Sequence, residues 1–156
     1  MFYSFTCGPT SLRMLMGYYN EWHSLEEIAL YMEQIGNSLY YGGVGGDTIV
    51  EAARHFGFKE AKLKYGWEEL KKSIASGNPC IVYLRIRAGD YPRYYLDDKP
   101  VYTNFTGGHW VVVCGLEADE NGNVKYVVVN DPASGANPKN LHPCPSIQHG
   151  RDLGFW

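Results

Sequence analysis

Cys7 opens a segment whose residue types are suited to nucleophilic chemistry. Gly8 and Pro9 follow it, and an amphipathic pattern comes next, which predicts a thiol at a helix N-terminus. A helix N-terminus and a neighbouring imidazolium lower a cysteine pKa from about 8.5 to roughly 3.5–7.5. The Cys7 N–H, unpaired at a helix start, can also donate to an oxyanion. The pattern favours a nucleophilic cysteine; the alternative is a buried structural one.

A histidine and an aspartate a hundred residues later complete a candidate triad. His109 follows two glycines and opens an apolar segment, and Asp131 ends the next one. An Asn-Gly turn between these segments predicts antiparallel neighbours, so Asp131, or less favourably Asn130, is expected beside His109. Such a carboxylate orients the imidazole for acyl transfer through a thioester, most simply peptide hydrolysis. The alternatives are a structural histidine at a strand edge and a plain Asx-Pro turn.

The first half of the chain reads as helices. A Ser24-Leu25-Glu26-Glu27 capping box begins one of them, and Asp47 is expected to cap another. Apolar side chains recur at helical spacing in each. The predicted helices span residues 7–19, 24–34, 47–55 and 67–76.

The second half changes to a strand pattern. Strands are predicted over residues 80–86, 109–116 and 124–130, and the valine-rich last two are expected to be covered on both faces. Residues 87–106 are expected to form a long binding loop without regular structure. The chain is therefore predicted to be an α+β protein, with N-terminal helices packed on a C-terminal antiparallel sheet in a single domain over 1–156.

Composition excludes several classes of partner. The formal net charge is −3, which gives no electrostatic basis for binding nucleic acid or an anionic membrane. No apolar run approaches the roughly 18 residues of a membrane span. Cysteine usage slightly favours the cytoplasm. Secretion stays open because the chain begins six residues before Cys7, as a trimmed or processed form would.

The other cysteines and histidines give weaker signals. Cys80 and Cys114 lie in apolar runs and are expected to act as small buried hydrophobes. His142, Cys144 and His149 could together bind a metal, but their Pro-broken spacing favours a tail segment. No metal and no cofactor is expected.

Aromatic and glycine-rich loops are the expected source of specificity. The chain has 13 tyrosines, several of them in pairs, and a tyrosine ring suits a groove wall or half-buried surface packing. Residues 37–46 and 87–106 are the loops predicted to line a substrate groove, with Gly42–Gly46 as a hinge or wall. Trp110 is expected either to shield the imidazole from water or to pack in the core.

At these residues the chain resembles the papain-like cysteine peptidases, and within them the bacteriocin-processing (double-glycine leader) peptidases. The resemblance covers roughly residues 6–135 and implies a papain-like fold. It implies that Cys7 is the nucleophile, His109 the general base and acid, and Asp131 the orienting residue of a peptidase acting on a peptide or protein. The matching motifs are residues 7–11, 24–29, 78–82, 108–115 and 129–132.

One departure from this family keeps other functions open. The family usually carries a glutamine about six residues before the cysteine, as a second oxyanion donor, and Met1 stands there in this chain. The leading hypothesis is a thiol hydrolase that cleaves peptide or isopeptide bonds. The alternatives are a thiol acyltransferase with the same triad, and a catalytically silent peptide-binding module with a degenerate oxyanion hole. The sequence predicts no oligomeric state.

Overall fold

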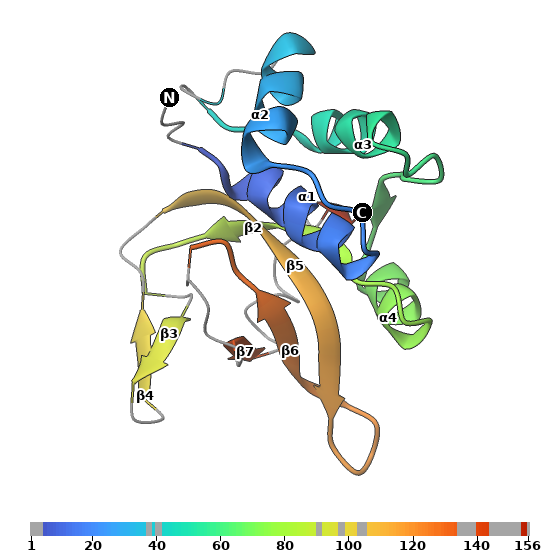
Figure 1. Cartoon of the computed structure of the whole chain (residues 1–156). Helices are drawn as coiled ribbons and strands as arrows, with labels where there is room; N and C mark the ends of the chain where they lie inside the picture. The colour runs from blue at the N-terminus through green and yellow to red at the C-terminus, as the bar shows by residue number, and fades with distance from the viewer. Residues whose placement is uncertain are drawn as a thin grey trace.

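The first three helices gather against one face of an antiparallel sheet, and the fourth packs on the other face, as the computed structural model shows (Figure 1). The structure describes residues 5–36, 39, 42–89, 92–96, 99–102, 106–133, 140–143 and 154–155. The helices are α1 (Cys7–Tyr18), α2 (Leu25–Gln34), α3 (Gly46–His55) and α4 (Trp67–Ala75). The strands are β1 (Lys64–Tyr65), β2 (Cys80–Ile86), β3 (Pro92–Leu96), β4 (Lys99–Tyr102), β5 (Gly107–Ala118), β6 (Val124–Asn130), β7 (Asn140–Pro143) and β8 (Gly154–Phe155).

The N-caps of α2 and α3 can be compared with the two capping predictions. At α2 the capping box is confirmed: the Glu27 N–H donates to Ser24 Oγ at 3.1 Å, and the Ser24 N–H donates to Glu27 Oε2 at 2.8 Å. The expected Asp47 cap of α3 is wrong, because Gly45 is the N-cap and Asp47 lies in the first turn. An aspartate stabilises a helix N-terminus at either place, so the residue type alone does not separate them.

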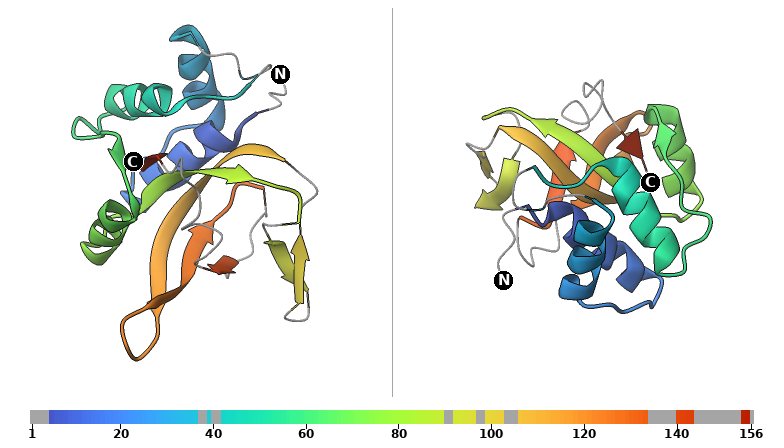
Figure 2. Two further views of the ribbon diagram at one scale, coloured as in Figure 1. Left: turned by 180° about the vertical axis from the view of Figure 1, so that it is seen from behind. Right: turned by 90° about the horizontal axis from the view of Figure 1, so that it is seen from above.

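The main sheet carries its long strands at the centre. Its order is β1-β8-β2-β5-β6-β7, and β5 runs antiparallel to both β2 and β6. The predicted strands are confirmed as β2, β5 and β6, with β5 longer than expected at both ends. Figure 2 shows α1 lying across β2 and β5, on the face of the sheet that also carries α2 and α3.

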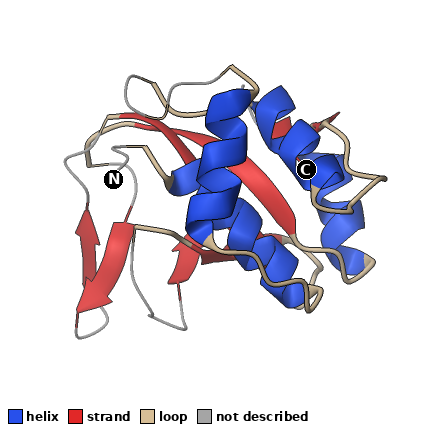
Figure 3. Cartoon of the chain, turned by 45° about the horizontal axis from the view of Figure 1, so that its top comes forward, coloured by secondary structure: helices blue, strands red, loops and turns tan. Residues whose placement is uncertain are grey.

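The expectation of a structureless segment over 87–106 is wrong in its middle. β3 and β4 pair antiparallel there as a separate two-stranded sheet, standing apart from the main sheet in Figure 3. Their sequences, Pro-Arg-Tyr-Tyr-Leu and Lys-Pro-Val-Tyr, contain the aromatic and β-branched residues that strands favour. Two residues, Asp97-Asp98, separate them in the sequence, which is the length of a tight hairpin connection.

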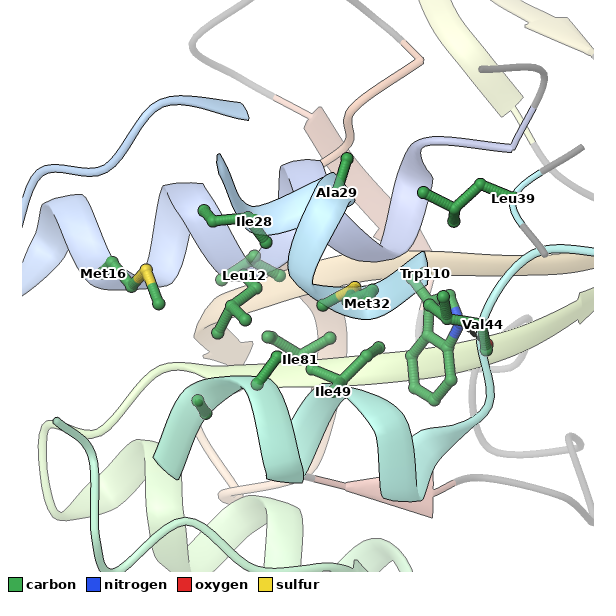
Figure 4. Packing of buried hydrophobic residues seen from close by; sticks show 13 residues of the cluster. Leu12, Met16, Ile28, Ala29, Met32, Leu39, Val44, Ile49, Ile81 and Trp110 are labelled. Atoms are coloured by element: carbon green, nitrogen blue, oxygen red, sulfur yellow. Dashed lines mark hydrogen bonds between the residues drawn. The ribbon is translucent and has the colours of Figure 1, made fainter. Parts of the chain in front are cut away.

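Alternate residues of β5 serve two hydrophobic clusters. Trp110 and Val112 pack with α1, α2 and α3 in the helix-side cluster, while Val111 and Val113 pack with α4 and β6 on the other face. Figure 4 shows the helix-side cluster, in which Trp110 lies beside Val44. The expected covering on both faces is confirmed for residues 109–113 of β5, where it holds His109 rigidly in place. It is wrong for β6, where Lys125, Tyr126 and Asn130 are exposed. Within the described chain, no helix is long and apolar enough to cross a bilayer.

Candidate active site

Cys7 is the first residue of α1, as the Gly-Pro pair after it predicts. The N-cap residue Thr6 makes no side-chain hydrogen bond to the helix, so no capping side chain occupies the N-terminal N–H groups. As the first helical residue, Cys7 has an N–H without an intrahelical acceptor. Its side chain is half-buried. The thiol therefore sits at the positive end of the α1 dipole, which favours the thiolate.

Hydrogen bonds fix the segment that leads into Cys7. The Phe5 N–H donates to the Leu39 carbonyl at 3.2 Å, and the Leu39 N–H donates to Glu33 Oε1 at 2.7 Å. Glu33, near the end of α2, thus anchors the backbone two residues before the thiol. Met1, at the position of the family's usual glutamine, lies outside the described residues.

His109 and Asp131 make a short, buried hydrogen bond. His109 Nε2 lies 2.6 Å from Asp131 Oδ1, and both residues are buried. The same oxygen accepts the Ala133 N–H at 2.8 Å, which holds the carboxylate in place. The structure thus brings Asp131 to His109, whereas Asn130 is exposed.

The hairpin register explains this pairing. The β5–β6 ladder pairs Val112 with Asn130, and continuing it by one residue places Asp131 across from Val111. Residues 109 and 111 share one face of a strand, so His109 and Asp131 lie on the same face as diagonal neighbours. A one-residue slip would have brought Asn130 there instead.

The Cys7 thiol hydrogen-bonds to the His109 ring. Because Asp131 engages Nε2, Nδ1 is the ring nitrogen left to face the sulfur. Cys7 and His109, more than a hundred residues apart in the sequence, therefore lie in contact in the structure.

Opposing effects set the pKa values of this pair. Burial raises the Cys7 pKa, but hydrogen bonds from the His109 side chain and the Trp110 backbone, with attraction to the His109 charge, outweigh it, so the pKa is lowered. Burial lowers the His109 pKa, yet hydrogen bonds to Asp131 and Cys7 raise it to about 9. At neutral pH both shifts favour thiolate beside imidazolium.

Gly8 is required because Val44 packs directly on α1. A Cβ at Gly8 would collide with Val44 Cγ2 and lie 3.5 Å from the Trp110 ring. The Trp110 indole N–H donates to the Val44 carbonyl at 3.0 Å, which ties the glycine-rich segment to β5 (Figure 4). Trp110 is 5 % exposed and lies in the helix-side cluster, so of its two expected roles the structure supports core packing.

We expect Gly8→Ala to destabilise the fold by about 1–3 kcal/mol, because the methyl group overpacks the junction with Val44. Chemical denaturation of the two proteins measures the change. Gly45→Ala is the matched control, since a Cβ at Gly45 meets nothing within 4 Å and its φ of −78° suits alanine. Equal stability of Gly8→Ala and the wild type would contradict the tight contact.

Tyr83 is a neighbour of the site that the sequence did not single out. A Cβ at Gly108 would collide with the Tyr83 hydroxyl, so the glycine before His109 makes room for this side chain. The Tyr83 ring also lies 4.9 Å from that of Trp110. Tyr83 lies opposite Trp110 in the β2–β5 ladder, a pairing that the sequence analysis did not predict.

The remaining cysteine and histidine predictions have mixed outcomes. Cys80 is buried as expected, and burial raises its pKa. Cys114 is exposed, so the expected core position is wrong: the β5–β6 register shifts between Val113 and Gly115, and this bulge turns the residue outward. Of the tail cluster, Cys144, His149 and the His142 side chain lie outside the described residues.

Metal-binding groups and cavities were also sought among the described residues. No group of three or more His, Cys, Asp or Glu side chains among them could hold a metal ion. They also line a cavity of about 560 Å³, between the C-terminal half of α1, α3 and β2, whose lining does not include Cys7, His109 or Asp131.

Comparisons with known proteins agree with this architecture. The structure resembles the peptidase domain of Streptococcus ComA, a bifunctional ABC transporter involved in a quorum-sensing pathway, with a TM-score of 0.65 and 18% identity. The match covers 100% of this chain and 93% of that domain, and it establishes the papain-like fold. The comparison with curated proteins gives no match. Residues 4–148 match the Peptidase_C39 like family. The chain therefore belongs to this family and is a cysteine peptidase-like protein.

Proposed function

We propose that this protein hydrolyses peptide or isopeptide bonds, with Cys7 as nucleophile, His109 as general acid and base, and Asp131 as the residue that orients and charges His109. The observation that carries the proposal is the 2.6 Å contact between His109 Nε2 and Asp131 Oδ1, on a ring whose other side meets the Cys7 thiol. Membership of a peptidase-like family supports a peptide or protein as the substrate.

The first half of the reaction forms a thioester. The Cys7 thiolate attacks the carbonyl carbon, and the carbonyl π electrons move to oxygen, to which the Cys7 N–H, with no acceptor within α1, can donate. As this intermediate collapses, the C–N bond breaks and the His109 imidazolium transfers its Nδ1 proton to the leaving amine. The products are an amine and an acyl group on the Cys7 sulfur.

The second half returns the enzyme to its starting state. The now neutral His109 takes a proton from water as the water oxygen attacks the thioester carbon. The C–S bond breaks, the carboxylic acid product leaves, and the Cys7 thiolate and the His109 imidazolium are restored. Asp131 keeps its charge throughout and stabilises the imidazolium.

Selective alkylation tests the activated thiolate. At pH 6, we expect iodoacetamide to label Cys7 at least about tenfold faster than Cys114, because the Cys7 pKa is lowered while burial raises that of Cys114, and each unit of difference changes the ratio of thiolate fractions about tenfold. Peptide mapping by mass spectrometry measures labelling at each cysteine. Cys114 is the matched control, since it is exposed and its rate is not limited by access.

Equal labelling of Cys7 and Cys114 would reject the activated thiolate. Turnover of a peptide library, with products analysed with and without an added amine, then separates the reaction types. A free carboxylate as the product indicates hydrolysis, and an amide of the added amine indicates acyl transfer. No turnover by a protein that labels selectively would favour the alternative of a peptide-binding module.

A further inference from the structure

Ser11 is a fully buried hydroxyl that joins the two elements bearing Cys7 and His109. It has 0% exposure, and its Oγ donates to the Trp110 carbonyl at 3.1 Å. Ser11 lies four residues after Cys7 in α1, and Trp110 lies one residue after His109 in β5. The Ser11–Trp110 contact therefore lies one helical turn from Cys7 and one strand residue from His109.

The backbone N–H and the backbone carbonyl of Trp110 both point towards α1. Its N–H hydrogen-bonds to the Cys7 sulfur, and its carbonyl accepts from Ser11. The N–H and C=O of one strand residue point to the same side, which accounts for both groups meeting the same helix. Side chains at positions i and i+4 of a helix share one face, so Cys7 and Ser11 can both contact the backbone of Trp110.

Trp110 pairs with Tyr83 of β2 on one edge of β5, while the β6 ladder on the other edge ends before it reaches Trp110. The β5–β6 ladder stops at the pair of Val112 with Asn130, and the same register would bring Pro132 opposite Trp110. Proline has no N–H to donate, so a strand partner there could not satisfy the Trp110 carbonyl. A buried carbonyl needs a donor, and Ser11 supplies it.

We propose that Ser11 is a positioning residue for the reaction: its hydrogen bond to the Trp110 carbonyl sets how α1 lies on β5, and thereby holds the Cys7 sulfur against the Trp110 N–H and the His109 ring. This inference rests on the proposed function. The strand side of the contact is held separately, because the Trp110 indole is tied to the Val44 carbonyl. The Ser11 hydroxyl thus fixes the position of α1 relative to the Trp110 backbone of β5.

The test compares Ser11→Ala with Ser11→Thr, and with Leu12→Val as the matched control. Leu12 is the next residue in α1, is 1 % exposed and packs in the apolar cluster, so its truncation loosens the helix without removing a polar contact. For each protein we would measure the midpoint of Cys7 alkylation against pH, kcat and KM on a peptide substrate, and Tm.

In Ser11→Ala we expect the alkylation midpoint to rise by at least half a pH unit and kcat to fall about tenfold or more, with KM within about twofold, since small displacements of a reacting group cost much rate. Ser11→Thr should retain the wild-type midpoint, and Leu12→Val should lower Tm with the midpoint unchanged.

Two outcomes would overturn the inference while leaving the proposed function intact. One is a Ser11→Ala protein with the wild-type midpoint and kcat. The other is a Ser11→Thr protein shifted as far as Ser11→Ala, which would assign the effect to packing. If the wild type itself shows no alkylation of Cys7 below the ordinary cysteine range, the proposed function fails, and the inference fails with it.

Discussion

Replacing Cys7 with alanine should reduce peptide hydrolysis by about 10⁴–10⁶-fold, the largest effect expected of any single substitution in this chain. The thioester cannot form without the sulfur, and His109 and Asp131 alone offer only weak assistance to water. Initial rates of peptide cleavage, followed by mass spectrometry of the products, measure the loss. Substrate binding should survive, because the alanine removes one atom from a preformed helix N-terminus.

Two further cysteine variants serve as controls for this prediction. Cys114→Ala changes an exposed thiol and Cys80→Ala a buried one, so together they report on general sensitivity to cysteine loss. Both should keep most of the wild-type kcat. A Cys7→Ala protein that still cleaves peptide at the wild-type rate would exclude a covalent mechanism through Cys7.

Replacing Asp131 with alanine should lower kcat/KM by about 10²–10⁴-fold and should change its pH dependence. In the wild type the reactive ion pair exists above the lowered pKa of Cys7 and below the His109 pKa of about 9. Activity should therefore fall on the acid side as the thiolate is protonated, and on the alkaline side as His109 loses its proton. Rates measured from pH 4 to pH 10 trace both limbs.

The effect specific to Asp131 is expected on the alkaline limb of the pH–rate profile. Burial lowers the His109 pKa, and the hydrogen bond to Asp131 is the foremost of the effects that raise it. Removing the carboxylate should therefore move the alkaline limb to lower pH. Asp131→Asn keeps a hydrogen-bond acceptor without the charge, so it should move that limb while losing less rate than Asp131→Ala.

Asn130→Ala is the matched control, because Asn130 is the exposed neighbour at the end of β6. It should keep both limbs and most of the rate. An Asp131→Ala protein whose alkaline limb stays near pH 9 would show that another group holds the His109 proton.

Much of the site follows from local sequence. Gly8 and Pro9 place Cys7 at a helix start, because their backbone preferences act within a few residues. The tight turn at Gly122, where φ is +80°, makes β5 and β6 antiparallel neighbours, and their register then brings Asp131 rather than Asn130 to His109. Turn chemistry is sufficient for the antiparallel pairing, but the register at His109 also depends on the irregularities between Val113 and Gly115 and between Glu117 and Ala118, which only the structure shows.

The predictions of secondary structure and burial failed where pairing between strands, rather than the local sequence, decides the outcome. β3 and β4 form in a segment that composition presented as a loop, because strand propensity depends on which partner is available. Cys114 faces outward because a bulge interrupts β5, and an apolar run of residues contains no mark of the extra residue.

The sequence by itself determined which candidate groups are present and where they lie in the elements: a thiol at a helix start, an imidazole at a strand start, and a carboxylate one hairpin away. Only the tertiary structure decided that the thiol meets the imidazole, since α1 and β5 are separated by more than eighty residues and are joined by side-chain packing rather than by a turn. The contacts that bring them together involve Ser11, Trp110 and Val44. Each of these residues finds its partner far along the chain, where no spacing rule connects them.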